Sequence, residues 1–173
     1  FFEDVVTLAR PRKHQTRSSF RYQSSGKVCS NVLLRMKQSL GLSASRVIQE
    51  ESLRLSLSNG RTMDIDVPLL SDAAVGSVVS AWYKSPMVVE NNILQAGADL
   101  AMVAGHTQRQ AAMSVLIPNA ESGLTIKERS QVEKAAYRKL ERFERSGVKI
   151  LRDDTTAGLA DQTIEWWKER GAA

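Results

Sequence analysis

The stretch LRLSLSNGRTMDIDV, residues 53–67, carries the clearest secondary-structure signal in the chain. Apolar and polar residues alternate on both sides of an Asn-Gly pair, and this period of two is typical of strands that bury one face. The Asn-Gly pair favours a tight reversal of the chain, so the stretch predicts a β-hairpin. Its alternating apolar residues are Leu53, Leu55, Leu57, Met63, Ile65 and Val67.

The length of the loop decides the register of this hairpin. A two-residue turn would set leucines opposite polar residues on one face. A three-residue loop that ends at Gly60 instead pairs Leu55 with Met63 and Leu53 with Ile65, and it gives glycine the left-handed position. We expect the three-residue loop. Because an isolated hairpin is only marginally stable, its apolar face must rest on helices or on a neighbouring chain.

Helical patterns flank the hairpin on both sides, with apolar residues recurring every three to four positions. Thr125 and Glu128 have capping-box spacing and predict a helix start. Asp72 is a suitable N-cap for a helix that follows it. The expected helices cover residues 30–40, 73–84, 87–104, 107–118, 125–146 and 156–170, with a second short helix over 44–51 and an extended piece over 148–151.

These patterns predict a mainly α fold of about five to six helices with one β-hairpin and an extended basic N-terminal arm. Residues 1–28 form the expected arm because they lack a sustained period and contain Pro11, Gly26 and many serines. Residues 29–173 form a single mostly helical domain with the hairpin near 53–67. A chain of 173 residues suits one domain of this kind.

Composition excludes several classes of protein. One cysteine excludes an internal disulfide framework, and two histidines exclude a three-histidine zinc site. No apolar run approaches the roughly 18 residues that a membrane span needs. The common nucleotide-binding, hydrolase and zinc-protease motifs are also absent from the sequence.

Charge is distributed unevenly along the chain. The formal net charge is +5, yet the segment from Val5 to Gln49 contains no acidic residue and nine basic ones. The residues after Gln49 therefore carry a net charge of −2. A basic segment ahead of a nearly neutral body suggests contact with nucleic acid or with an acidic surface.

Three interpretations of the basic segment stay open. It can lie on phosphates, with Phe20 and Tyr22 beside Arg21 available to stack on bases. It can be an organelle-targeting remnant, since such peptides are rich in Arg and Ser and poor in acids. It can also be a solvated tail. The first residue, Phe1, is compatible with a processed mitochondrial or viral precursor and with a partial chain, and localisation stays open between a reducing compartment, a virion and the mitochondrial matrix.

Candidate catalytic groups are sparse. Cys29 has Lys27 nearby but no histidine close in sequence, so we interpret it as a small packing residue. His14 is one more polar residue of the arm. His106 follows Gly105 between two expected helices, and a general base there would need a carboxylate partner that the sequence does not place.

Two acidic pairs also deserve interpretation. Asp64 and Asp66 share one face of a strand, where such a pair can hold Mg²⁺ or simply form the wet face of the strand. Asp153 and Asp154 precede the last helix, where acids stabilise a helix N-terminus. We expect the structural roles in both cases, and we expect no metal site and no cofactor.

Two features indicate protein partners. Trp166 and Trp167 are adjacent on a helix, so their side chains point in different directions and cannot both face the same core. One of them is therefore a candidate interface anchor. The helix over 126–146 interleaves basic and acidic residues, with Glu141 and Arg145 spaced to pair, as on a solvated face.

The sequence therefore predicts a non-enzymatic structural or assembly protein. Its helical body makes contacts with other protein subunits, which can include further copies of itself. Its basic arm contacts nucleic acid, with RNA favoured and DNA still open, as in a nucleocapsid- or ribonucleoprotein-type subunit. The alternatives are an accessory subunit of a large mitochondrial complex with a threading arm, and a small metal-dependent enzyme. The expected nucleic-acid-binding residues are Arg10, Arg12, Lys13, Arg17, Arg21, Lys27, Arg35 and Lys37.

Overall fold

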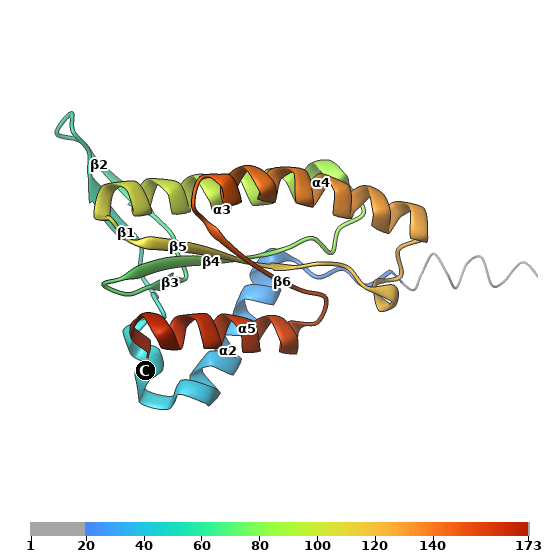
Figure 1. Cartoon of the computed structure of the whole chain (residues 1–173), viewed down its shortest axis with the longest axis horizontal. Coiled ribbons are helices and arrows are strands. Elements are labelled where there is room, and N and C mark those ends of the chain that lie inside the picture. The colour runs from blue at the N-terminus through green and yellow to red at the C-terminus, as the bar shows by residue number, and fades with distance from the viewer. Residues whose placement is uncertain (1–19, 173) are drawn as a thin grey trace, which may run out of the picture.

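A four-stranded sheet lies between two pairs of helices (Figure 1). The computed structural model describes residues 20–172 of the chain. The strands lie in the order β3-β4-β5-β6, with β4, β5 and β6 parallel and β3 antiparallel to β4. The strand bounds are β3 Leu69–Leu70, β4 Ala74–Ser80, β5 Gln110–Leu116 and β6 Lys149–Asp153.

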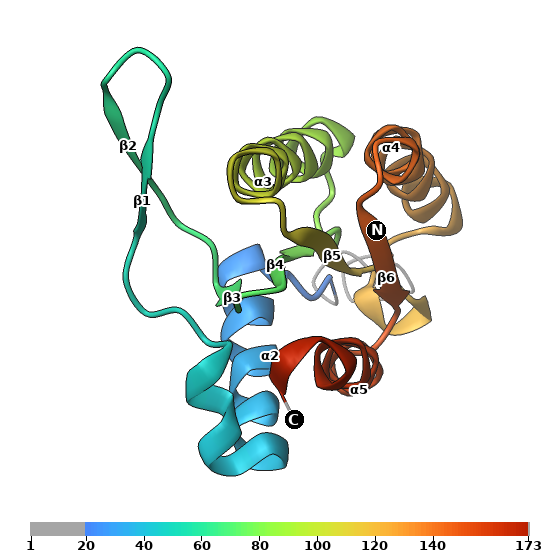
Figure 2. The same ribbon diagram turned by 60° about the vertical axis from the view of Figure 1, so that its left-hand side comes forward.

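Two of the helices form the connections between neighbouring parallel strands. Helix α3, Pro86–Thr107, joins β4 to β5, and α4, Ile126–Arg145, joins β5 to β6. Both crossovers step in the same direction along the sheet, so the usual right-handed connection places α3 and α4 on the same face. Helices α2, Ser25–Leu40, and α5, Thr156–Trp167, cover the opposite face (Figure 2).

The sheet therefore separates two hydrophobic cores. Val75, Val79 and Met113 point into the core beneath α3 and α4. Val78 and Leu116 point into the other core, beneath α2 and α5. Strands that are buried on both faces have few polar residues, because neither face of the sheet meets water.

The predicted mainly α fold is wrong, because two of the expected helices are central parallel strands. Residues 73–84 contain β4, and residues 107–118 contain β5. The apolar residues of β4 are spaced like a helical stripe, yet they divide between the two cores. A short apolar run bounded by loops fits a buried strand as well as a buried helix, and its β-branched residues favour the strand.

Two boundaries near the N-terminus also differ from the prediction. Helix α2 begins at Ser25, with the Ser24 side chain accepting a hydrogen bond from the Lys27 amide, so the predicted cap at Ser30 lies inside the helix. The last four residues of the expected arm are consequently helical. Gly41, with φ of 59°, ends α2 as expected, but a 3₁₀ segment, Gly41–Arg46, replaces the short helix predicted over 44–51.

The hairpin is confirmed in detail. Strands β1, Leu53–Ser56, and β2, Thr62–Ile65, pair Leu53 with Ile65 and Leu55 with Met63. Gly60 has the expected positive φ, 81°. The hairpin projects from the body as a separate two-stranded sheet (Figure 2), while Leu55 and Ile65 reach the core beneath α3 and α4.

Other local predictions are confirmed as well. Thr125 and Glu128 form both hydrogen bonds of a capping box at the start of α4. Helix α5 begins at Thr156 and passes into a π-helical turn, Lys168–Ala172. The extended piece expected over 148–151 is β6. Within residues 20–172, no helix combines the length and the apolar character that a bilayer crossing requires.

Candidate nucleic-acid interface

One edge of the sheet gathers the starts of all four long helices. We call this edge the carboxyl edge, because β4, β5 and β6 end there at Ser80, Leu116 and Asp153. Helices α3, α4 and α5 begin there after short connections, as Figure 1 shows for α4 and α5. In open α/β sheets, ligands bind outside the carboxyl ends of the strands.

The start of α2 is fastened to the same edge. The Ser80 amide donates a 2.9 Å hydrogen bond to Ser25 Oγ, and the Ser25 amide donates a 2.9 Å bond to the Tyr83 hydroxyl. Each of the four helices has a serine or threonine whose side chain caps its first turn. The partial positive charges of four helix N-termini therefore lie along one edge.

The described end of the basic arm crosses this edge. The Arg21 amide donates a 2.7 Å hydrogen bond to the Ser122 carbonyl oxygen. Lys84 Nζ lies 5.5 Å from the centroid of the Phe20 ring. The Tyr22 and Tyr83 rings meet edge to face, with centroids 5.2 Å apart. Backbone and ring contacts thus hold residues 20–22, and the Arg21 side chain is left exposed.

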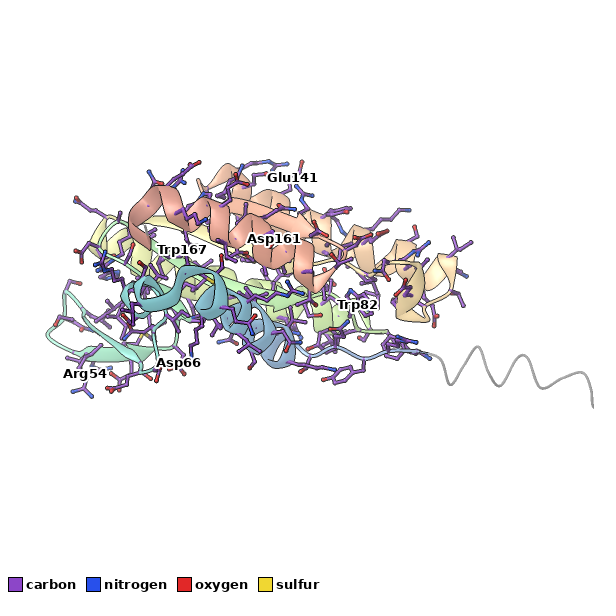
Figure 3. All side chains as sticks on the ribbon, turned by 90° about the horizontal axis from the view of Figure 1, so that it is seen from below. Arg54, Asp66, Trp82, Glu141, Asp161 and Trp167 are labelled. Carbon is purple, nitrogen blue, oxygen red and sulfur yellow. The ribbon has the colours of Figure 1, made fainter. Side chains whose placement is uncertain are left out.

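Buried Trp82 supports this arrangement from beneath. Its indole Nε1 donates a 2.9 Å hydrogen bond to the Ile117 carbonyl oxygen, which joins the segments that follow β4 and β5. Its amide donates to Ser80 Oγ. Figure 3 shows Trp82 toward the end of the molecule where the helices begin, well separated from Trp167. Trp82 lies within residues 73–84, over which the sequence pattern predicts a helix.

Charge along the carboxyl edge is divided. Arg21, Lys27 and Lys84 are exposed on the part formed by the arm, α2 and the start of α3. Glu121 and Asp154 are exposed on the part formed by the β5–α4 loop and the start of α5. We call the first part the basic edge, defined by Arg21, Lys27 and Lys84.

Local hydrogen bonds occupy two other acidic side chains of the carboxyl edge. Glu128 belongs to the capping box, and hydrogen bonds from Thr125, together with the charge of nearby Lys84, lower its pKa despite some burial. Partial burial acts to raise the pKa of Asp153, but hydrogen bonds from Thr155 and Gln162 outweigh it and hold the pKa low. Asp153 accepts from the Thr155 amide, which fits the predicted role of acids at this helix start.

Large apolar side chains are also exposed near the basic edge. Tyr22 is 58% exposed beside Arg21, and Met87 is 68% exposed in the first turn of α3. Ile126, in the first turn of α4, is 81% exposed. Aromatic and apolar groups among cations suit the faces of unpaired bases, and they also suit a protein partner.

The other predicted nucleic-acid residues are distributed as follows. Arg10, Arg12, Lys13 and Arg17 lie outside the described residues. Arg35 and Lys37 lie on the exposed side of α2, farther along the helix. Lys37 Nζ is 4.0 Å from Glu50, a solvent-exposed pair of little energetic weight.

The two predicted anchor tryptophans are both buried within this chain. Trp166 is 8% exposed and Trp167 is 1% exposed, with their rings edge to face at 5.3 Å. Trp167 packs against Gly76 of β4, where the absence of a side chain makes room for the indole ring. Both adjacent tryptophans are therefore buried on the same helix. A partner contact through Trp166 or Trp167 stays a prediction.

The candidate catalytic groups are held in ordinary structural contacts. Arg54 Nε donates a 2.9 Å bond to Asp64 on the hairpin, and this contact lowers the pKa of Asp64. Asp66 accepts from the Ser52 hydroxyl. The exposed His106 ring lies 2.9 Å from the Met102 carbonyl oxygen at the end of α3. Across residues 20–172, no three Asp, Glu, His or Cys side chains are grouped so as to hold a metal ion.

The outer side of α4 carries ion pairs rather than a basic stripe. Arg145 lies 3.3 Å from Glu141, as the sequence predicts, and Arg152 of β6 lies 3.9 Å from Glu144. Figure 3 labels Glu141 on this outer side, away from Trp82. The mixture of signs makes this surface less suited to phosphate than the basic edge.

Two hollows flank β4 where its outer edge extends beyond β3. Their volumes are about 320 and 310 Å³, and Ser25 and Ser77 line both of them. Asp66 lines one hollow and Asp99 the other. Burial, together with the charge of Asp66, raises the pKa of Asp99. These acidic hollows repel phosphate and so bound the basic edge on the side of the hairpin.

Comparison with known proteins adds no assignment, since no protein-family model, curated protein or solved structure matches the chain.

Proposed function

We propose that the chain is a non-enzymatic structural or assembly protein that binds nucleic acid through its basic arm and the basic edge. The observation that carries this proposal is the acid-free segment from Val5 to Gln49, which has nine basic residues. Its described end is fixed at the carboxyl edge by Arg21 and Tyr22. Of the nine basic residues, Arg21 and Lys27 therefore lie at the carboxyl edge, where Lys84 adds a third exposed cation.

The mechanism is neutralisation of phosphates. Arginine offers a planar pair of donors that matches phosphate oxygens, and lysine adds point charges. Contacts of this kind fix position on the backbone but carry no base sequence, so binding is weakly selective and strongly dependent on salt. The fixed polypeptide at residues 20–22 limits the conformational entropy that the exposed Arg21 loses on binding.

A single-stranded nucleic acid is the favoured ligand, and RNA is the one that we propose. Tyr22 presents a ring beside Arg21, and such a ring can stack only on a base that is not already paired in a duplex. On the other part of the carboxyl edge, exposed Lys127 lies among Glu121 and Asp154, so the basic edge is the part with the more uniform positive charge.

Charge substitutions at the basic edge test the proposal. In the triple variant Arg21→Gln, Lys27→Gln, Lys84→Gln, each lost phosphate contact should reduce the salt slope for single-stranded RNA by about 0.7, or about two in total. The matched control is Arg61→Gln, Arg138→Gln, Lys149→Gln, which removes the same charge from exposed positions on the hairpin, α4 and β6. Equal slopes for the two variants would contradict the proposal.

An accessory subunit of a larger protein complex is the second candidate function. The exposed apolar side chains of Met87, Val88 and Ile126 favour it, because they lie in the first turns of neighbouring helices at the carboxyl edge. This candidate predicts stable co-purifying protein partners that are lost on substitution of Met87 and Ile126 by Ser. It also predicts that RNA affinity does not distinguish the two charge variants.

A further inference from the structure

Three arginines from distant parts of the sequence line one cavity at the opposite edge of the sheet. This amino edge is where β4 and β5 begin, at Ala74 and Gln110. The cavity has a volume of about 630 Å³. Arg46, Arg109 and Arg170 line it, from the 3₁₀ segment, the start of β5 and the C-terminal π-helical turn.

Arg109 is held by a neutral acceptor. Its Nε donates a 2.6 Å hydrogen bond to the Ser71 carbonyl oxygen, which leaves the two terminal nitrogens of the guanidinium for other partners. The preceding residue, Gln108, has a φ of 55°, the only non-glycine with positive φ among the described residues. This left-handed residue ends α3 and directs the chain into β5, so the backbone sets the position of Arg109.

Arg170 is fixed by four neighbouring groups. Its Nε donates to Gln110 Oε1 at 2.8 Å, and its Nη1 donates to the Trp166 carbonyl oxygen at 3.1 Å and to Glu169 at 3.2 Å. Its guanidinium carbon lies 4.2 Å from the centroid of the buried Trp166 ring. Nη2 is left to face other partners.

Ser71 joins these two arginines. Its carbonyl oxygen accepts from Arg109, and its hydroxyl donates a 3.1 Å bond to the backbone carbonyl oxygen of Arg170. The third cation, Arg46, is exposed, and neither an ion pair nor a side-chain hydrogen bond joins it to another described residue.

The balance of charge at the cavity is positive. Asp72 and Glu169 also line it, so three guanidinium groups face two carboxylates. The Glu169 side chain is exposed and contacts only Nη1 of Arg170 among the described residues. Two guanidiniums oriented largely by neutral acceptors keep their charge for an anion, and planar paired donors match the oxygens of phosphate.

We propose that this cavity binds a phosphate monoester through Arg46, Arg109 and Arg170. A volume of about 630 Å³ holds more than a phosphate ion and lies within the range of small-molecule sites. The phosphate can belong to a free small molecule or to the 5′ end of a nucleic acid, since the arginines recognise the same group in both. The site is on the amino edge and does not depend on the proposed role of the arm.

Calorimetric titration at constant ionic strength tests this site. The probes are inorganic phosphate, adenosine 5′-monophosphate against adenosine, and a short RNA with a 5′-phosphate against the same RNA with a 5′-hydroxyl. The site predicts that adenosine 5′-monophosphate binds while adenosine does not, and that the arginine variants described below weaken this binding. For the RNA pair, it predicts the gain in affinity that the 5′-phosphate adds, because the basic arm can bind either RNA. A gain in RNA affinity from the 5′-phosphate that is lost in Arg46→Gln indicates a nucleic-acid end, and binding of the monophosphate with no such gain indicates a free small molecule.

Variants of the full chain assign the binding to the cavity. Arg109→Gln and Arg46→Gln should each weaken phosphate binding about tenfold to a hundredfold, because each removes hydrogen bonds from a charged donor. Glu169→Gln should strengthen binding, because it removes a like charge. Arg61→Gln, on the hairpin loop, is the matched control and should leave the affinity unchanged.

Three results would overturn the site: no phosphate-dependent binding by the unaltered chain, an equal loss in Arg61→Gln, or no loss in the folded Arg46→Gln variant. Thermal unfolding of each variant shows whether it is folded. Arg46→Gln is the safer variant, since Arg46 makes no side-chain hydrogen bond to another described residue. If the cavity does not bind phosphate, the comparison of salt slopes at the basic edge still tests the proposed function. The two proposals can therefore fail independently.

Discussion

Cys29 shows how a single partly buried group responds to its surroundings. It lies in the second turn of α2 and packs against the core beneath α2 and α5. Burial raises the pKa of its thiol to about 11. The thiolate is therefore scarce at neutral pH, and the thiolate is the reactive form.

Stability should consequently fall in alkaline solution through Cys29. The unfolded thiol ionises near pH 8.5, whereas the folded thiol keeps its proton until about pH 11, so folding is disfavoured progressively between these values. Below pH 8.5 both states are protonated and the effect vanishes. Urea unfolding of the unaltered chain and of Cys29→Ala, followed from pH 7 to pH 11, measures it. A stability difference between the two that does not change over this range would contradict the raised pKa.

At the scale of single residues, the sequence predicts those features whose interacting partners lie a few positions away along the chain. The capping box of Thr125 and Glu128 and the turn at Gly60 are foreseen because their partners are three residues away or fewer. The cavity at the amino edge is not foreseeable in this way. Arg46, Arg109 and Arg170 follow one another at intervals of more than sixty residues along the chain and meet only after the sheet has formed.

At the scale of elements, β4 and α5 meet through a glycine. A Cβ placed on Gly76 would lie 2.7 Å from Trp167 and 3.3 Å from Leu69 Cβ. The tryptophan ring thus packs directly on the strand backbone. The sequence shows the adjacent tryptophans but not the flat strand position that receives one of them.

The substitution Gly76→Ala should reduce the free energy of unfolding by about 1–3 kcal/mol, the usual penalty for overpacking a core. The matched control is Gly105→Ala near the end of α3, where a Cβ would meet nothing within 4 Å. That change should stabilise the chain by about 0.5–1 kcal/mol, because alanine is the better helix former. Urea unfolding of both variants makes the comparison. Equal effects would show that the Trp167 contact is not tight.

The burial of each strand also explains why the hairpin strands are predicted correctly while β4 and β5 are predicted as helices. The hairpin has one wet face, so its period of two is visible and even its register is predictable. The strands β4 and β5 are covered on both faces, which removes the alternation and leaves apolar runs that resemble helices. The mainly α prediction fails for this reason, although α3, α4 and α5 are correctly anticipated.

At the scale of the whole molecule, the two edges of the sheet differ in what they gather. The carboxyl edge holds the described end of the arm, the helix N-termini and the basic edge. The amino edge holds the arginine cavity. The charge asymmetry predicted from the sequence is therefore distributed in space over two surfaces, and a linear reading identifies only the first of them.

The most direct measurement is the salt dependence of single-stranded RNA binding by the full chain and by residues 20–173. Truncation at residue 19 keeps the contacts of Phe20, Arg21 and Tyr22 and the Ser24 cap of α2, so the fold is preserved. The account predicts a steep slope of log affinity against log salt for the full chain. It also predicts a slope shallower by about three for the truncated chain, since the four basic residues removed contribute about 0.7 each. Identical slopes for the two chains would contradict a nucleic-acid-binding arm and would favour the protein-partner alternative.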